Sequence, residues 1–222
     1  MIKAVLFDLD GTLLNRDESV KSFIHNQYDR YIQFMNHIPK DTYINRFIEL
    51  DQRGYVWKDR VYQVLVDEFR IANITWEDLL QDYITQFQNN VIPFQDLTSM
   101  LDELVNTNLT LGLISNGKGQ FQMNNIKGLG IEKFFNTILI SEWEGIKKTN
   151  PEIFNKAMRE LNVEPHESMF VGDHPEKDVQ AAQNVGMLSV WKQSEEWTDV
   201  IADYCINHLN EIPSILEILN KE

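Results

Sequence analysis

Short apolar runs recur along the chain, separated by stretches in which apolar residues return every three or four positions. Apolar runs of this length are typical of buried parallel strands. The predicted strands cover residues 2–7, 109–115, 137–141, 168–173 and 187–191. Helical patterns over 96–105 and 151–161 lie between them. Alternating strands and helices imply right-handed crossovers, so we predict an α/β fold with a Rossmann-like, doubly wound parallel sheet.

The stretch between residues 17 and 92 has helical periodicity and no convincing strand. Thr75, followed three residues later by Asp78, resembles a capping box at a helix start. We therefore predict an all-helical cap domain over residues 17–92, inserted into a core of residues 1–16 and 93–222. Its aromatic residues are expected to form its own core.

The 222 residues are 43% hydrophobic and carry a formal net charge of −14. This acidic balance argues against nucleic acid and anionic membranes as partners, because both are bound mainly through Lys and Arg. No apolar run approaches the roughly 18 residues of a membrane span, and Lys3 interrupts the N-terminal run too soon for a signal peptide. We expect a cytoplasmic protein that is a monomer or a weak dimer. The single cysteine, Cys205, is expected to be half-buried.

Two carboxylates, Asp8 and Asp10, follow the first predicted strand and precede Gly11 and Thr12. Strand side chains at positions i and i+2 project to the same side, and ligands in open α/β sheets bind beyond the carboxyl ends of the strands. Two like charges this close need a cation nearby, or one must take up a proton. The alternative is a solvated turn after an edge strand, but the run over 2–7 indicates a central one.

A second pair of carboxylates comes later in the chain. The strand over 168–173 ends in Asp173, and Asp178 follows five residues later. Carboxylate oxygens from two strand ends suit Mg²⁺. Asp178 alone could instead be a helix-start carboxylate favoured by the helix dipole.

Two further segments offer groups for an anion. Ser115 and Asn116 follow a predicted strand, and a strand-to-helix turn there would present the hydroxyl and backbone N–H groups. Taken alone, Asn116-Gly117 is a hairpin signal. Lys147 and Lys148 supply positive charge that could hold a phosphate.

These four segments, in this order, resemble the four motifs of the haloacid dehalogenase-like hydrolase superfamily. Asp8-Leu9-Asp10-Gly11-Thr12 is similar to the first motif, Ser115 to the second, Lys148 to the third, and Gly172-Asp173 with Asp178 to the fourth. The resemblance covers the whole chain, including a helical cap inserted after the first motif.

The resemblance implies a Mg²⁺-dependent phosphatase that hydrolyses a small phosphorylated metabolite through an aspartyl-phosphate. Asp8 would be the nucleophile, and Asp10 would act as general acid and then as general base. Mg²⁺ would be held by Asp8, the backbone carbonyl of Asp10 and Asp173, with Asp178 in the outer shell.

The resemblance also implies which residues bind the substrate. Ser115 and Lys148 would hold the phosphoryl oxygens, helped by Asn116 and Thr12. Arg53, between two predicted cap helices, would contact a distal anionic group, although an ordinary solvated charge is the simpler interpretation.

The third motif departs from the family pattern. Many relatives read Lys-Pro-Asp-Pro, whereas this chain reads Lys148-Thr149-Asn150-Pro151. Either Lys147 or Lys148 could therefore face the site, with Lys148 favoured by its distance from Pro151.

Three alternatives to a phosphatase stay open. A phosphomutase would use the same residues. A haloacid dehalogenase shares the nucleophile, but it lacks an acid where this chain has Asp10, because a halide leaving group needs no proton. A non-enzymatic binding protein would not need Asp8, Asp10, Lys148 and Asp173 together.

Overall fold

A six-stranded parallel sheet forms the centre of the computed structural model, which describes residues 1–221. Its strand order is β3-β2-β1-β4-β5-β6. The chain first adds β2 and β3 on one side of β1 and then β4, β5 and β6 on the other, so the strand order reverses beside β1. The predicted doubly wound sheet is confirmed. The strands are β1 (Ala4–Phe7), β2 (Thr110–Ser115), β3 (Thr137–Ile140), β4 (Ser168–Gly172), β5 (Leu188–Lys192) and β6 (Tyr204–Ile206).

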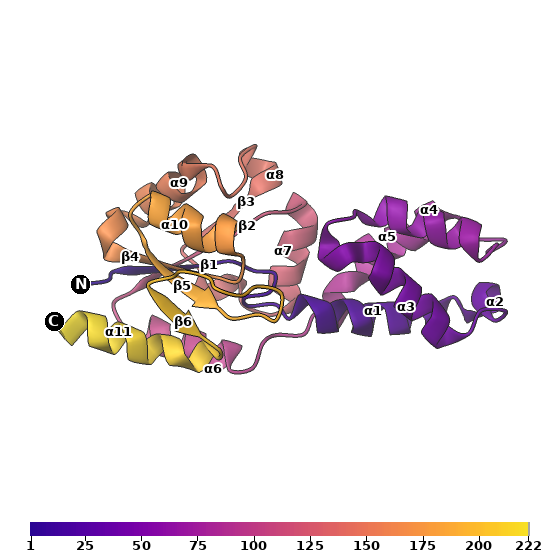
Figure 1. Cartoon of the computed structure of the whole chain (residues 1–222), viewed down its shortest axis with the longest axis horizontal. Helices are drawn as coiled ribbons and strands as arrows, with labels where there is room; N and C mark the ends of the chain where they lie inside the picture. Colours follow the sequence, from indigo (N-terminus) through magenta and orange to yellow (C-terminus); the bar gives the residue numbers. More distant parts are fainter. Residues whose placement is uncertain (222) are drawn as a thin grey trace. The chain divides into compact units, whose positions relative to one another are not determined.

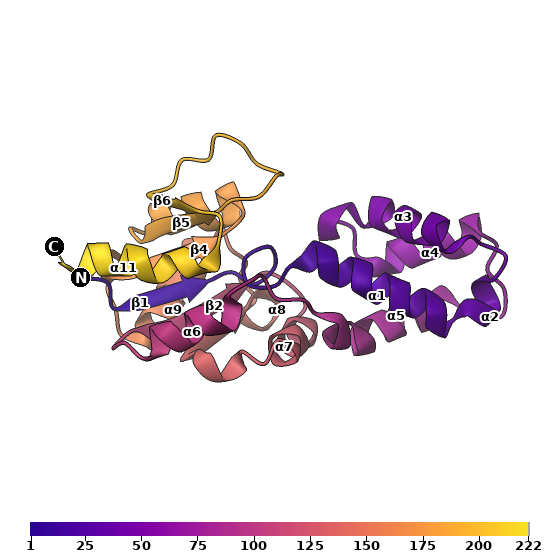
Figure 2. The same ribbon diagram turned by 90° about the horizontal axis from the view of Figure 1, so that it is seen from below.

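Helices cover both faces of the sheet (Figure 1). On one face lie α9 (Pro151–Leu161) and α10 (Ala181–Asn184), whereas α6 (Leu97–Val105) and α11 (Ile212–Lys221) lie side by side on the other (Figure 2). No helix among residues 1–221 has an apolar stretch long enough to cross a membrane. The other helical segments between residues 93 and 221 are α7 (Gly119–Gly128), η3 (Glu132–Phe134), α8 (Ser141–Glu144), η4 (Pro165–Glu167), the π-helix η5 (Pro175–Gln180) and η6 (Leu209–Glu211).

Every predicted strand is present, with bounds shifted by no more than two residues. The sixth strand, β6, was not predicted, because it has three residues and only Ile206 is buried, which leaves no periodicity to detect. The expectation for Cys205 was wrong. Cys205 is exposed on β6, the edge strand of the sheet.

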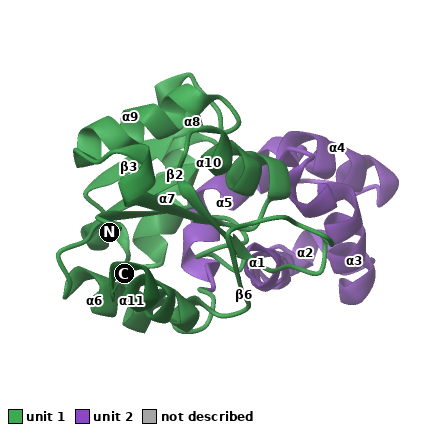
Figure 3. Ribbon diagram, turned by 60° about the vertical axis from the view of Figure 1, so that its left-hand side comes forward, with its two compact units in different colours: residues 1–15, 93–222 green, residues 16–92 purple. Residues whose placement is uncertain are grey.

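The chain divides into two compact units, one of residues 1–15 with Pro93 onward and one of residues 16–92 (Figure 3). The second unit begins one residue before the predicted insert, because α1 begins at Arg16, and both end at residue 92. It is entirely helical: α1 (Arg16–Arg30), α2 (Ile32–Met35), α3 (Lys40–Asp51), η1 (Gln52–Gly54), α4 (Lys58–Glu68), α5 (Trp76–Gln86) and η2 (Phe87–Asn90).

Aromatic side chains form the core of this helical unit, as predicted. Phe23 meets Tyr83 edge-on at a centroid distance of 5.1 Å, and Phe47 meets Tyr62 at 5.4 Å; all four are buried. The predicted capping box at Thr75 is also present at the start of α5. Such aromatic pairs stabilise the folded unit by more than the burial of their apolar surface alone.

The packing of α9 on the sheet generates a stability prediction. Ile153 on α9 is fully buried in an apolar cluster with Leu6 and Ile114, whereas Ile218 on α11 is 57% exposed. We expect Ile153→Ala to lower the free energy of unfolding by about 2–5 kcal/mol through lost burial and a residual cavity. The matched Ile218→Ala should change it by less than about 0.5 kcal/mol. Urea unfolding measures both, and equal losses would contradict this packing.

Candidate active site

Carboxylates gather where β1 and β4 end. Asp8 directly follows β1, and its backbone N–H donates to the Val171 carbonyl of β4 at 2.9 Å. Asp173 directly follows β4. One carboxylate oxygen each from Asp8, Asp173 and Asp178 lies within 4.8 Å of the others. The topology thus brings together three of the acids selected from the sequence, at the place where open α/β sheets bind ligands.

Gly11 makes this gathering possible. Its φ is +86°, and a Cβ atom at this position would lie 2.3 Å from Oδ2 of Asp173. A residue with a side chain would be strained in this backbone conformation and would collide with the carboxylate. The glycine after Asp10 therefore leaves space for Asp173 beside the loop that carries Asp8.

Lys148 brings positive charge to these acids. Its Nζ donates to Oδ1 of Asp8 and, at 2.7 Å, to Oδ1 of Asp178, and the residue is only 5% exposed. The Lys148 backbone is held by Asn116, whose Oδ1 accepts from Lys148 N at 2.8 Å and whose Nδ2 donates to Lys148 O at 3.2 Å. Lys147 is exposed. The structure thus turns Lys148, and not Lys147, toward Asp8.

The backbone after this lysine explains the departure from the family pattern. Thr149 has a φ of +71°. The ring of a proline fixes φ near −65°, so a proline could not occupy this position without changing the loop. The chain nevertheless buries Lys148, and α9 begins two residues after Thr149 with Asn150 as its N-cap.

Burial leaves these acids poorly solvated. Desolvation is the main cause that raises the pKa of Asp8 to about 7, with Lys148 opposing the rise, and it raises the pKa of Asp173 to about 8, where the charges of Asp8 and Asp178 add to the effect. Desolvation alone would lower the pKa of Lys148, but Asp178 and Asp8 raise it. One ammonium does not balance three carboxylates. The oxygen donors and the crowding fit a hard divalent cation such as Mg²⁺.

Gln122 was missed by the sequence analysis, although it contacts two predicted residues. Its Nε2 donates to Oδ2 of Asp10 at 2.5 Å and to Oγ of Ser115 at 2.7 Å. The overlooked signal was Gly117, where a Cβ atom would lie 2.7 Å from Cγ of Gln122. Asn116-Gly117 is therefore not a hairpin turn. Its glycine lets α7 pack Gln122 against the loop.

Thr12, Asp178 and Arg53, which were also predicted, each have defined contacts. Thr12 is fully buried, and its hydroxyl donates to Oδ2 of Asp8 over a long 3.4 Å. The second carboxylate oxygen of Asp178 accepts from the backbone N of His174 at 3.0 Å. Arg53 belongs to the helical unit, where it forms an ion pair with Asp17 at 3.1 Å.

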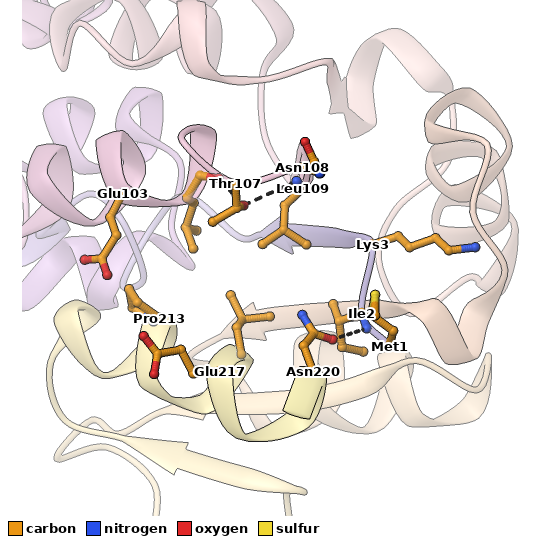
Figure 4. Close-up of a pocket in the computed structure, with 12 residues that line it drawn as sticks. Met1, Ile2, Lys3, Glu103, Thr107, Asn108, Leu109, Pro213, Glu217 and Asn220 are labelled. Atoms are coloured by element: carbon orange, nitrogen blue, oxygen red, sulfur yellow. Dashed lines mark hydrogen bonds between the residues drawn. The ribbon is translucent and has the colours of Figure 1, made fainter. Parts of the chain in front are cut away.

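A pocket of about 310 Å³ lies elsewhere, between α6, α11 and the residues that precede β1 and β2 (Figure 4). Its lining includes Ile2, Leu104, Leu109 and Leu216, with Glu103 and Glu217 also present. It lies at the amino ends of β1 and β2, whereas the carboxylates lie at the carboxyl ends. Asp8, Asp10, Asp173, Asp178 and Lys148 do not line it.

Comparisons with known proteins agree with this arrangement. Residues 5–192 match the family model of the haloacid dehalogenase-like hydrolases. The glyceraldehyde 3-phosphate phosphatase of Methanocaldococcus jannaschii is 30% identical over 100% of both chains. The crystal structure of a HAD phosphatase from Thermococcus onnurineus has a TM-score of 0.68 at 28% identity, covering 97% of this chain and 98% of the other. A 2-haloacid dehalogenase from Pseudomonas syringae has a TM-score of 0.65 at 26% identity, covering 99% and 100%.

The raised carboxylate pKa values predict how stability depends on pH and metal. Asp8 and Asp173 keep protons that the unfolded chain releases above its ordinary carboxyl pKa of 3.8, so without metal the free energy of unfolding should fall as the pH rises from about 4 to about 8. Mg²⁺ should therefore recover more stability at a pH of about 8 than at about 5. Thermal unfolding in EDTA and in Mg²⁺ measures this.

A control tests whether these carboxylates are the cause. Asp173→Asn removes one of the two acids and should weaken both the pH dependence and the magnesium effect. A magnesium gain that is equal at both pH values would contradict the assignment.

Proposed function

The chain belongs to the haloacid dehalogenase-like hydrolases, among their phosphatase members, and from this premise we propose a Mg²⁺-dependent phosphatase that hydrolyses a small phosphorylated metabolite through an aspartyl-phosphate on Asp8. The observation that carries the proposal is the buried Asp8, bound to Lys148, with the acid Asp10 two residues away in the same loop.

The first half of the reaction forms the covalent intermediate. A carboxylate oxygen of Asp8 attacks phosphorus while the bond from phosphorus to the substrate oxygen breaks. Oδ1 of Asp8 accepts from Lys148, whereas among residues 1–221 the side-chain contact of Oδ2 is the long one from Thr12, so Oδ2 is the freer atom for attack. Asp10 gives its proton to the departing oxygen, which leaves as an alcohol.

The second half restores the enzyme. Asp10, now a carboxylate, takes a proton from a water molecule whose oxygen attacks phosphorus. The bond between phosphorus and Asp8 breaks, inorganic phosphate leaves, and the Asp8 carboxylate is regenerated. Each turnover consumes one water and returns the proton to Asp10.

Charge neutralisation is the other requirement of phosphoryl transfer. Mg²⁺ would be held by Asp8, the Asp10 carbonyl and Asp173, and when bound it would offset charge on the phosphoryl oxygens. Both carboxylate oxygens of Asp178 already accept hydrogen bonds, from Lys148 and from His174 N, which suits an outer-shell role.

Ser115 and Lys148 would contact the phosphoryl oxygens directly. Asn116 uses its amide on the backbone of Lys148, so its help would be to position that lysine. Thr12 is fully buried against Asp8 and would act in the same indirect way.

The helical unit, residues 16–92, would act as a cap that closes the site against bulk water. Arg53 stays our candidate for a distal anionic group of the substrate. Its loop is unusual, because Gln52, Arg53 and Gly54 all have positive φ values of 46°, 54° and 90°. Lys58, at the start of α4, does not suit this role, because it is buried in an ion pair with Asp51. A cytoplasmic monomer or weak dimer stays a prediction.

Asp10 separates the phosphatase from a dehalogenase. A departing alkoxide needs a proton, whereas a halide does not, so a dehalogenase would have no use for an acid held next to its nucleophile. The phosphomutase alternative differs in excluding water from the intermediate, and product analysis with a sugar phosphate distinguishes it.

We expect activity on phosphate monoesters that depends on Mg²⁺. A screen of small monoesters, with glyceraldehyde 3-phosphate among them, should show turnover in Mg²⁺ and none in EDTA, and Asp8→Asn should abolish it. If no monoester is hydrolysed, or if Asp8→Asn keeps full activity, the proposed function is wrong.

The two neighbouring lysines provide a matched pair. Lys148→Met should lower kcat/KM by about 100-fold or more, because it removes a preorganised donor and leaves Asp8 and Asp178 uncompensated. Lys147→Met makes the same change at an exposed position and should leave kcat/KM nearly unchanged. Steady-state kinetics on the substrate found in the screen measures both, and the reverse ranking would contradict the site.

A further inference from the structure

Helix α7 directs two amide side chains into the protein beneath the site. Gln122 and Asn125 lie three residues apart and therefore on one face of the helix; they are 3% and 1% exposed. Amides buried this deeply are costly unless they are hydrogen-bonded. Gln122 donates to Asp10 and Ser115, and Nδ2 of Asn125 donates to Oε1 of Gln122 at 3.2 Å.

The chemistry of Asp10 determines which way these amides point. The Oδ2 atom of Asp10 accepts a hydrogen bond from Gln122, so Gln122 presents its NH₂ group to that oxygen and turns its own carbonyl oxygen away. That oxygen then needs a donor, which is the NH₂ group of Asn125. Turning either amide over would bring two oxygens together. The order of donors is thus set from Asn125 through Gln122 to Asp10.

This order leaves one atom unsatisfied. Oδ1 of Asn125 is buried and has no hydrogen-bond partner among the described residues. Such orphaned acceptors are rare in folded proteins. The unpaired oxygen is explained if the hydrogen bonds to Asp10 and Ser115, rather than the packing of α7, determine how the two amides are oriented.

We propose that Gln122 is a positioning residue for the phosphatase reaction and that Asn125 fixes its orientation. Gln122 gives one N–H to Oδ2 of Asp10 and the other to Oγ of Ser115. Oδ1 of Asp10 is then the oxygen that exchanges the proton with the leaving group and with water. The Ser115 hydroxyl, which accepts from Gln122, is left to donate its own hydrogen to a phosphoryl oxygen.

Gln122 acts through these two residues and not on the substrate. Its Cγ lies beneath Gly117, where a Cβ atom would approach to 2.7 Å, so the loop after β2 covers the side chain. The inference rests on the proposed function, because the roles of Asp10 and Ser115 come from it.

The decisive variant is Gln122→Met, which keeps the length of the side chain and removes both donors. Loss of acid positioning should matter most when the leaving group is basic. We expect kcat/KM for an alkyl phosphate, which reports the step that forms the aspartyl-phosphate, to fall by about 10-fold to 100-fold, which is part of the roughly 10²-fold to 10⁴-fold that a positioned general acid contributes. The loss for p-nitrophenyl phosphate should be much smaller, because nitrophenolate leaves without a proton.

Two further variants keep the test sharp. Asn125→Leu removes the donor to Gln122 and should give a weaker loss with the same preference for the alkyl substrate. Gln120→Met makes the same change at an exposed position of α7, where the side chain donates to Asn124, and should leave kcat/KM for both substrates unchanged. Equal losses on both substrates in Gln122→Met, or no loss, would overturn the proposal.

A measurement on the wild-type protein separates this proposal from the proposed function. In the resting protein, the NMR signals of the Gln122 side-chain NH₂ should be resolved and protected from solvent exchange, and Asn125→Leu should weaken that protection. Rapid exchange in the wild type would overturn the amide order whatever the activity. If the signals are protected but no monoester is hydrolysed, the amide order is correct and the proposed function is wrong. The catalytic role of Gln122 is then wrong as well, because it depends on that function.

Discussion

The contact between Lys148 and two buried carboxylates is the interaction on which the site depends. Asp8 and Asp178 both accept from its Nζ, and Asp173 lies close enough to share a cation with them. Because the chain has a net charge of −14, a phosphate needs local positive charge at its binding site, and Lys148 supplies such a charge here. The buried ammonium partly balances the acids, and the remaining imbalance is what a divalent cation would neutralise.

Several small features serve to keep these charges together. Gly11 leaves space for Asp173, and Gly117 lets Gln122 reach Asp10 and Ser115. Asn116 fixes the backbone of Lys148 from the end of the neighbouring strand. The fold supplies the common location, because parallel strands beside the reversal of strand order end at the same edge. The side-chain contacts then convert that location into a defined geometry.

The sequence predicts the parts of this arrangement that are local or repetitive. Apolar runs predict five strands, and Asp8 and Asp173 lie at strand ends, so their convergence follows from topology. Gln122 could not be found in this way, because a polar residue within a helix shows nothing of its partners until α7 packs against the loop. Likewise, the distance from Pro151 only favours Lys148 over Lys147, whereas the burial of Lys148 and its contacts with Asp8 and Asp178 are seen only in the folded chain.

Trapping the covalent intermediate would show directly whether Asp8 is the nucleophile. The protein would be mixed with its substrate and Mg²⁺, quenched in acid within one turnover, digested, and analysed by mass spectrometry. We expect a phosphoryl group on the peptide that contains Asp8, assigned to Asp8 by fragmentation and lost on longer incubation before the quench. A phosphoryl group on another residue, or complete turnover without any phosphorylated peptide, would contradict it.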